Sequence, residues 1–292
     1  MPSKGYSSPV TTLKEENTVH DALIKMHQKN IKRIVITSSD TKRDIPIGIV
    51  TESDIVKLLD EDETDRALDE IPLDEVVSKS LITITEGQED HMAQCAIRMK
   101  TFWINSVVVV NDNSELVGIT TSTDLTKSFS EYYRGEYNVK DYMTKRVFTC
   151  RESDALEFAL TSLNKNKISR LVVTDNKGNP TGIITYNTFL RHSEYFKLGS
   201  KPKARNYLIP NESATDLFVR DLMNNRILTV NQNEDLAKAA NLMIEHHLSG
   251  IPVINENDTV KLVGIISKAD IATAFSEVKT HRQLIARDTH FR

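Results

Sequence analysis

The chain of 292 residues has two cysteines, one tryptophan and no long apolar run, and each scarcity excludes a class of protein. Cys95 and Cys150 form no CxxC pair, so we expect neither a disulfide framework nor a cysteine zinc cluster. No run approaches the roughly 20 apolar residues of a membrane-spanning helix, and the N-terminus lacks an apolar signal segment. These absences predict a cytoplasmic protein with no membrane segment.

The chain also lacks an excess of positive charge. Its 41 acidic and 37 basic residues leave a formal net charge of −4, which gives no general attraction to nucleic acid. A basic cluster, Lys201, Lys203 and Arg205, lies in a predicted loop at 198–216, and the tail from residue 279 is basic too. This is thin support for a nucleic-acid partner, so we expect anions to be recognised at local sites.

Catalytic motifs are missing as well. The sequence contains no GxSxG, HExxH, P-loop or GxGxxG pattern, and the adjacent His246 and His247 would point about 100° apart on a helix. We therefore predict no catalytic residues, no metal site and no enzyme activity. The single tryptophan, Trp103, precedes a predicted strand and is expected to pack.

What the chain does contain is one pattern that occurs four times. Each copy begins with a short β-like run that includes a threonine, followed by an amphipathic helix, a second apolar strand, turn residues and a third strand. The threonines are Thr12, Thr83, Thr149 and Thr229. Direct β-β hairpins argue against a doubly wound sheet, so the pattern predicts an α+β fold of four β-α-β-β-α units.

The third strand of each copy ends in a motif of glycine, two further residues, a hydroxyl and a carboxylate three places later. It reads Gly48–Asp54 in the first copy, Gly118–Asp124 in the second and Gly264–Asp270 in the fourth. The third copy, Gly182–Thr188, has threonine in place of the carboxylate. Alone, each motif predicts a helix capping box. Its recurrence suggests a second role for the carboxylate.

The unit, its motif and the stretch Leu248-Ser-Gly-Ile-Pro-Val-Ile254 resemble cystathionine-β-synthase (CBS) domains. The resemblance implies two CBS pairs stacked in a disc, as in the nucleotide-sensing γ subunit of AMP-activated protein kinase. We expect the pairs at 1–135, with units near 8–60 and 71–133, and at 136–292, with units near 137–197 and 217–278.

The resemblance also implies ligand residues, in clefts between paired units. Asp54, Asp124 and Asp270 would accept both ribose hydroxyls, with the hydroxyls of Thr51, Thr121, Thr185 and Ser267 near phosphate. Arg33 and Arg170, at the starts of second strands, and Lys268 would bind phosphate. The base would meet strand backbone at Ile31, Ile104, Ile168 and Leu248, beside the four threonines.

These features predict a regulatory protein that needs no cofactor, binds AMP, ADP or ATP and signals to an unidentified effector protein. It would act as a homo-oligomer or as a self-contained four-unit disc. S-adenosylmethionine is the alternative ligand. A CBS interaction scaffold, or a nucleic-acid binder without nucleotide sensing, is the alternative function.

Overall fold

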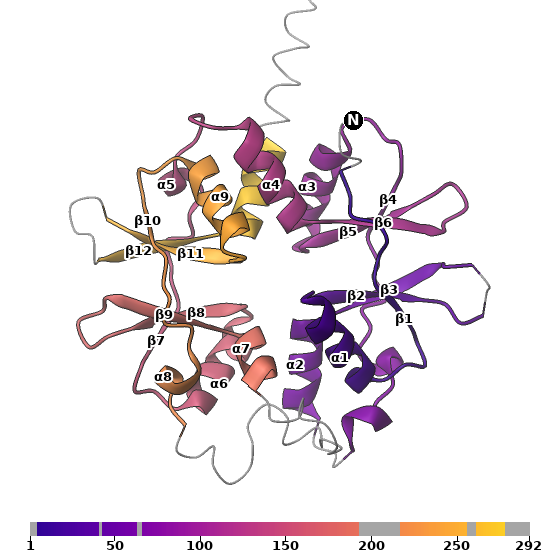
Figure 1. Ribbon diagram of the computed structural model, residues 1–292, viewed down its shortest axis with the longest axis horizontal. Helices are drawn as coiled ribbons and strands as arrows, with labels where there is room; N and C mark the ends of the chain where they lie inside the picture. Colours follow the sequence, from indigo (N-terminus) through magenta and orange to yellow (C-terminus); the bar gives the residue numbers. More distant parts are fainter. Residues whose placement is uncertain (1–4, 41–42, 63–65, 193–216, 256–260, 278–292) are drawn as a thin grey trace, which may run out of the picture. The chain divides into compact units, whose positions relative to one another are not determined.

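Every predicted repeat forms one three-stranded sheet with its own helices (Figure 1). The structure is a computed structural model that describes residues 5–40, 43–62, 66–192, 217–255 and 261–277. In each sheet the first strand runs parallel to the middle strand, and the middle strand runs antiparallel to the third. The predicted α+β class and the β-α-β-β-α order are confirmed. The predicted loop at 198–216, with its basic cluster, and the basic tail lie outside the described residues.

The elements follow the same order in all repeats. Repeat 1 comprises β1 (Thr12–Lys14), α1 (Val19–Lys29), β2 (Arg33–Thr37), β3 (Pro46–Thr51) and α2 (Glu52–Glu61). Repeat 2 comprises β4 (Thr83–Thr85), α3 (His91–Phe102), β5 (Ser106–Val110), β6 (Leu116–Thr121) and α4 (Ser122–Tyr132). Repeat 3 comprises β7 (Thr149–Arg151), α6 (Leu156–Asn166), β8 (Arg170–Thr174), β9 (Pro180–Thr185) and α7 (Tyr186–His192). Repeat 4 comprises β10 (Val230–Asn231), α9 (Leu236–Glu245), β11 (Gly250–Ile254), β12 (Leu262–Ser267) and a helix over 268–277. Short helices η1 (Leu68–Glu70), η2 (Leu73–Glu75), α5 (Val139–Tyr142) and α8 (Val219–Leu222) connect them.

The first helix of each repeat ends in a left-handed turn that leads into the middle strand. Asn30, Trp103, Lys167 and His247 have positive φ angles at this position, and all four are exposed. Trp103 has 93% of its surface exposed, so the expectation that it packs is wrong. Its position in the repeat faces solvent, and polar residues occupy it in the other three copies.

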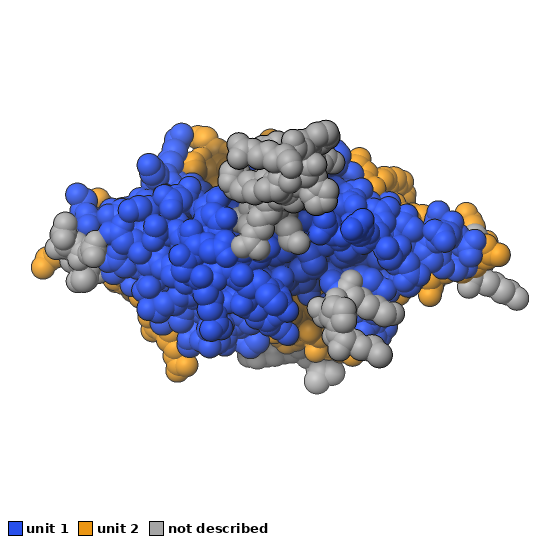
Figure 2. Space-filling view, turned by 90° about the horizontal axis from the view of Figure 1, so that it is seen from above, with its two compact units in different colours: residues 1–9, 82–147, 228–292 blue, residues 10–81, 148–227 orange. Residues whose placement is uncertain are grey.

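The chain divides into two compact units (Figure 2). Each unit contains two repeats and its own apolar core. Unit 1, residues 1–9, 82–147 and 228–292, holds repeats 2 and 4. Unit 2, residues 10–81 and 148–227, holds repeats 1 and 3. Helices α4 and α9 are in contact in unit 1, and α2 and α7 in unit 2. The compact units therefore do not coincide with the predicted halves 1–135 and 136–292, because these helix contacts join repeats from different halves. Independent folding of each half stays a prediction.

Each repeat also forms backbone hydrogen bonds with a short segment of the chain that belongs to another repeat. In the sequence this segment precedes the first strand of that other repeat. We call these segments leaders (residues 5–9, 76–79, 143–146 and 223–226). The leader of repeat 1 bonds to repeat 2 through Ser7 and Ile119, and the leader of repeat 2 bonds to repeat 1 through Ser78 and Ile49. Repeats 3 and 4 exchange leaders in the same way, through the pairs Thr144 with Ile265 and Asn224 with Ile183.

The leaders explain the glycine of the repeated motif. A Cβ atom on Gly48 would lie 2.3 Å from Cγ2 of Val77 and 2.8 Å from the carbonyl oxygen of Ser78. The other three motif glycines meet their leaders at similarly short range, with Tyr6 against Gly118, Met223 against Gly182 and Met143 against Gly264. The glycine is needed because the leader crosses the third strand at van der Waals contact.

Within the described ranges, no helix combines the length and apolar character required to cross a membrane.

Candidate functional site

The hydroxyl and carboxylate of the motif lie at the start of a helix, as the capping interpretation predicts. In repeat 1, Oδ2 of Asp54 accepts from the Thr51 backbone N–H at 2.9 Å and from its hydroxyl at 2.7 Å. Repeats 2 and 4 repeat this geometry with Asp124 on Thr121 and Asp270 on Ser267. In all three repeats the same carboxylate oxygen, Oδ2, is therefore committed to the cap.

The second oxygen already receives a hydroxyl in unit 1. Oδ1 of Asp124 accepts from Ser7 at 3.3 Å, and Oδ1 of Asp270 accepts from Thr144 at 3.5 Å. Both hydroxyls belong to leaders. These long bonds show that a hydroxyl can reach this oxygen while the cap stays intact. In repeat 3 the Thr185 N–H donates to the Thr188 hydroxyl at 3.1 Å, so the cap survives there without a carboxylate.

The start of the middle strand lies directly beside this motif. Arg33 pairs with Thr51 across the β2–β3 hairpin, and Arg170 pairs with Thr185 across β8–β9. Ser106 and Gly250 occupy the same register position in repeats 2 and 4. The two predicted phosphate-binding arginines are thus adjacent to the predicted hydroxyls, and both belong to unit 2.

Unit 2 gathers further cations around these arginines. The environment of the Lys32 ammonium lowers its pKa, chiefly through desolvation, and the positive charges of Arg170, Arg33 and Arg191 lower it further. Glu52 opposes the shift. Three arginines and one carboxylate from repeats 1 and 3 therefore act on Lys32. Such a cluster favours the binding of a multiply charged anion.

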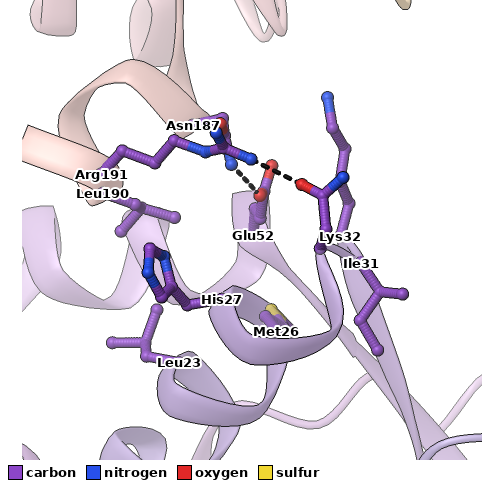
Figure 3. Close-up of a pocket in the computed structure, with 10 residues that line it drawn as sticks. Leu23, Met26, His27, Ile31, Lys32, Glu52, Asn187, Leu190 and Arg191 are labelled. Carbon is purple, nitrogen blue, oxygen red and sulfur yellow. Dashed lines mark hydrogen bonds between the residues drawn. The ribbon is translucent and has the colours of Figure 1, made fainter. Parts of the chain in front are cut away.

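Glu52 is the buried member of the cluster, with 9% of its surface exposed. Its Oε1 accepts a hydrogen bond of 2.5 Å from the Asn187 side-chain amide, so repeat 3 contacts repeat 1 here (Figure 3). Desolvation raises the pKa of the Glu52 carboxyl, and Lys32, Asn187, Arg191 and Arg33 oppose that rise.

A small cavity adjoins these residues. It has a volume of about 30 Å³ and is lined by Leu23, Met26, His27, Asn30, Ile31, Lys32, Glu52, Asn187, Leu190 and Arg191. Arg191 and Asn187, both on α7, point toward repeat 1 (Figure 3). Nη2 of Arg191 donates to Oδ1 of Asn30 at 2.6 Å. The cavity has room for water.

Unit 1 has a different charge at the corresponding contact. The residue after the motif hydroxyl is Glu52 in repeat 1 but Lys268 in repeat 4. The ammonium of Lys268 donates to the Thr123 hydroxyl of repeat 2 at 3.1 Å. Thr123 and Asn187 hold the same motif position, so the two contacts correspond with the charge reversed.

The backbone at the predicted base contacts is partly engaged within the fold. The backbone N–H groups of Ile31, Ile104, Ile168 and Leu248 donate to carbonyls of Met26, Met99, Leu163 and Met243 at 2.9–3.1 Å. These bonds close the preceding helices in the manner of a Schellman motif. The N–H groups at these positions are therefore engaged in helix closure, and base recognition by this backbone stays a prediction.

The four predicted threonines lie at or beside the first strands. Thr12, Thr83 and Thr149 pair with Val35, Val108 and Val172, and Thr229 directly precedes β10. Their part in base recognition stays a prediction.

Sequence reasoning missed Lys32, Glu52, Asn187 and Arg191 as members of the site. Two signals were present: Lys32 precedes Arg33 directly, and Asn187 and Arg191 are four residues apart, on one face of a helix. Which helix that face would meet depends on tertiary packing. Among the described residues, no group of three or more His, Cys, Asp or Glu is arranged to hold a metal ion.

Comparison with known proteins agrees with the repeat structure. A family model described as the CBS domain matches residues 5–61, 73–131, 139–195 and 219–277. The uncharacterized protein MJ1225 of Methanocaldococcus jannaschii is 24% identical over 282 residues, which are 91% of this chain and 95% of the relative. Its crystal structure, proposed as an archaeal homologue of γ-AMPK, has a TM-score of 0.78 at 21% identity and covers 94% of this chain and 99% of its own.

Two further proteins are similar over different lengths. A conserved protein of Pyrococcus horikoshii has a TM-score of 0.63 at 19% identity and covers 94% of this chain and 100% of its own. MJ1404 of M. jannaschii is 30% identical over 172 residues, 59% of this chain but only 40% of that relative. The two structural likenesses show the fold alone.

Proposed function

Because the chain belongs to the CBS-domain family, we propose that it is a regulatory protein that binds adenine nucleotides and passes their occupancy to a partner protein. The observation that carries the proposal is the cluster of Lys32, Arg33, Arg170 and Arg191 in unit 2. It lies beside motif hydroxyls at helix starts, where helix N-termini also favour a phosphate group.

The ribose would bind to the carboxylate oxygen that takes no part in the helix cap, Oδ1. A ribose hydroxyl would replace the leader hydroxyls that reach Asp124 and Asp270 in unit 1. Repeat 3, with Thr188, would not bind ribose in this way. We therefore expect at most three nucleotides per chain.

The four cations favour phosphorylated ligands over S-adenosylmethionine. The sulfonium group of S-adenosylmethionine is positively charged, so the cations repel it. Unit 1 lacks an arginine at its two strand starts, so S-adenosylmethionine stays the alternative ligand there.

The test is isothermal titration of the full chain with AMP, ADP, ATP, adenosine and S-adenosylmethionine. Charge-assisted hydrogen bonds of roughly 1.5 to 3 kcal/mol should make AMP bind about 10- to 150-fold more tightly than adenosine. Equal affinity for adenosine and AMP would remove the phosphate role. Preference for S-adenosylmethionine over every nucleotide would change the ligand, and absence of binding to all five would favour a scaffold.

A further inference from the structure

Glu52 lies among the positively charged side chains that would bind a phosphate group in unit 2. Its carboxylate interacts with Lys32, Arg33 and Arg191, and Lys32 in turn interacts with Arg170, so one negative charge offsets part of four positive charges in unit 2. Because it is buried, water screens its charge weakly. A phosphoryl group near the same cations would meet a like charge as well as the attraction of the cluster.

The position of Glu52 is not a general requirement of the repeat. The residue after the motif hydroxyl is Glu52, Ser122, Tyr186 and Lys268 in repeats 1 to 4, whereas the cap around it is present in all four. Helix capping therefore does not select a carboxylate here. A charge at this position must be explained by what it faces.

Glu52 faces repeat 3. Oε1 accepts a hydrogen bond from Asn187 on α7 (Figure 3). Arg191, one turn further along α7, donates to Asn30 at the end of α1. The same carboxylate thus neutralises part of the cluster and holds one of the polar contacts between the two repeats of unit 2.

We propose that Glu52 is a built-in counter-anion that competes with the phosphate of a nucleotide for the cations of unit 2, so that ligand binding weakens the Glu52–Asn187 contact between repeats 1 and 3. The inference rests on the proposed nucleotide binding. It adds a regulatory step: occupancy of unit 2 is reported as a change in the contact between α2 and α7. Unit 1 has Lys268 instead of a carboxylate at the equivalent position, and this lysine should strengthen phosphate binding.

The direct test is Glu52→Gln, which keeps the shape and the acceptor for Asn187 but removes the charge. Titration with AMP is carried out on the full chain in a background of Asp124→Ala and Asp270→Ala, which leaves repeat 1 with the complete motif. E52Q should bind AMP about tenfold more tightly than this background. Equal or weaker binding would overturn the inference alone, provided that the background protein binds AMP.

A second variant changes the sign of the effect. Asn187→Asp adds a negative charge on the other side of the contact, and AMP affinity should fall about tenfold or more.

Lys268→Gln in the otherwise unmodified chain is the matched control in unit 1, where AMP should bind several-fold more weakly. If one unit 2 variant fails to fold, the other still decides, since N187D that binds AMP as tightly as the background also overturns the inference. Absence of AMP binding in the background, E52Q and unmodified proteins alike would overturn the proposed function together with the inference.

Discussion

A Cβ atom on Gly118 would lie 2.1 Å from Cδ2 of Tyr6, a residue 112 positions earlier in the chain. The three nearest atoms to that Cβ all belong to the Tyr6 ring. Tyr6 is held over repeat 2 by a hydrogen bond from its hydroxyl to Glu86 at 3.1 Å and by the neighbouring ring of His91. The motif of repeat 2 therefore requires glycine at position 118 because the leader of repeat 1 occupies the space of a Cβ atom.

Gly118→Ala should destabilise the protein by about 1–3 kcal/mol, the usual cost of overpacking. In a Tyr6→Ala background the added methyl group meets an open space, so most of this loss should disappear. A double-mutant cycle from urea unfolding measures the coupling. Equal losses in both backgrounds would show that Tyr6 is not the cause.

Asp270→Ala should separate the capping role of the carboxylate from its ligand role. Loss of the cap should cost about 1 kcal/mol of stability, visible in thermal unfolding without ligand. Loss of the ribose acceptor should remove one nucleotide site or weaken it about tenfold or more. The matched control is Asp21→Ala, which removes the same kind of capping box from α1, where Thr18 and Asp21 have no motif glycine. D21A should lose a similar amount of stability but keep the nucleotide affinity of the parent. If D270A also keeps that affinity, the carboxylate of the motif serves only as a helix cap.

Glu52→Gln should raise the melting temperature at neutral pH. The raised pKa of Glu52 means that folding favours its protonated form. Stability is therefore lost as pH rises from the ordinary carboxyl value of 4.5 through the raised value, and the glutamine variant escapes this loss. The advantage of E52Q should shrink as pH falls toward 4.5. Glu61→Gln, at an exposed position of the same helix, is the control and should follow the parent profile; a pH-independent gain in E52Q would argue against the charge.

The two cysteines should be inert in the folded protein. Burial raises the pKa of Cys95 to about 11 and that of Cys150 to about 12, so neither thiol ionises near neutral pH. Ellman's reagent at pH 8 should find almost no reactive thiol in the native chain and two after unfolding in guanidinium. Rapid stoichiometric labelling of the native protein would contradict the burial of both residues.

A chain that ends at Gly135 should fold and self-associate. It contains α2 and α4 but lacks α7 and α9, which contact them in the full chain. Those uncovered helix faces should pair with a second copy, giving a dimer by light scattering. An unfolded product, fully sensitive to protease, would show that the first half is not a folding unit.

The repeat pattern predicted the fold well because each repeat has its own apolar periodicity, its own hairpin and its own helix-capping interaction. It also placed Arg33 and Arg170 at equivalent strand starts, and both belong to unit 2. The contacts between repeats could not be predicted in this way. Glu52 meets Asn187 across 135 residues, and no local pattern encodes that contact. The backbone at Ile31 was assigned to a base, and the closure of α1 by the N–H of that residue was not foreseen.

The exchange of leaders has a consequence for how such a chain can change its length during evolution. A repeat lost on its own would take away the segment that its partner needs and would expose the glycine strand that it covered. Loss of repeat 2, for example, would remove Ser78 from Ile49 and leave Ser7 without Ile119. Gene duplications and deletions that preserve every leader contact therefore add or remove two repeats together, 1 with 2 or 3 with 4.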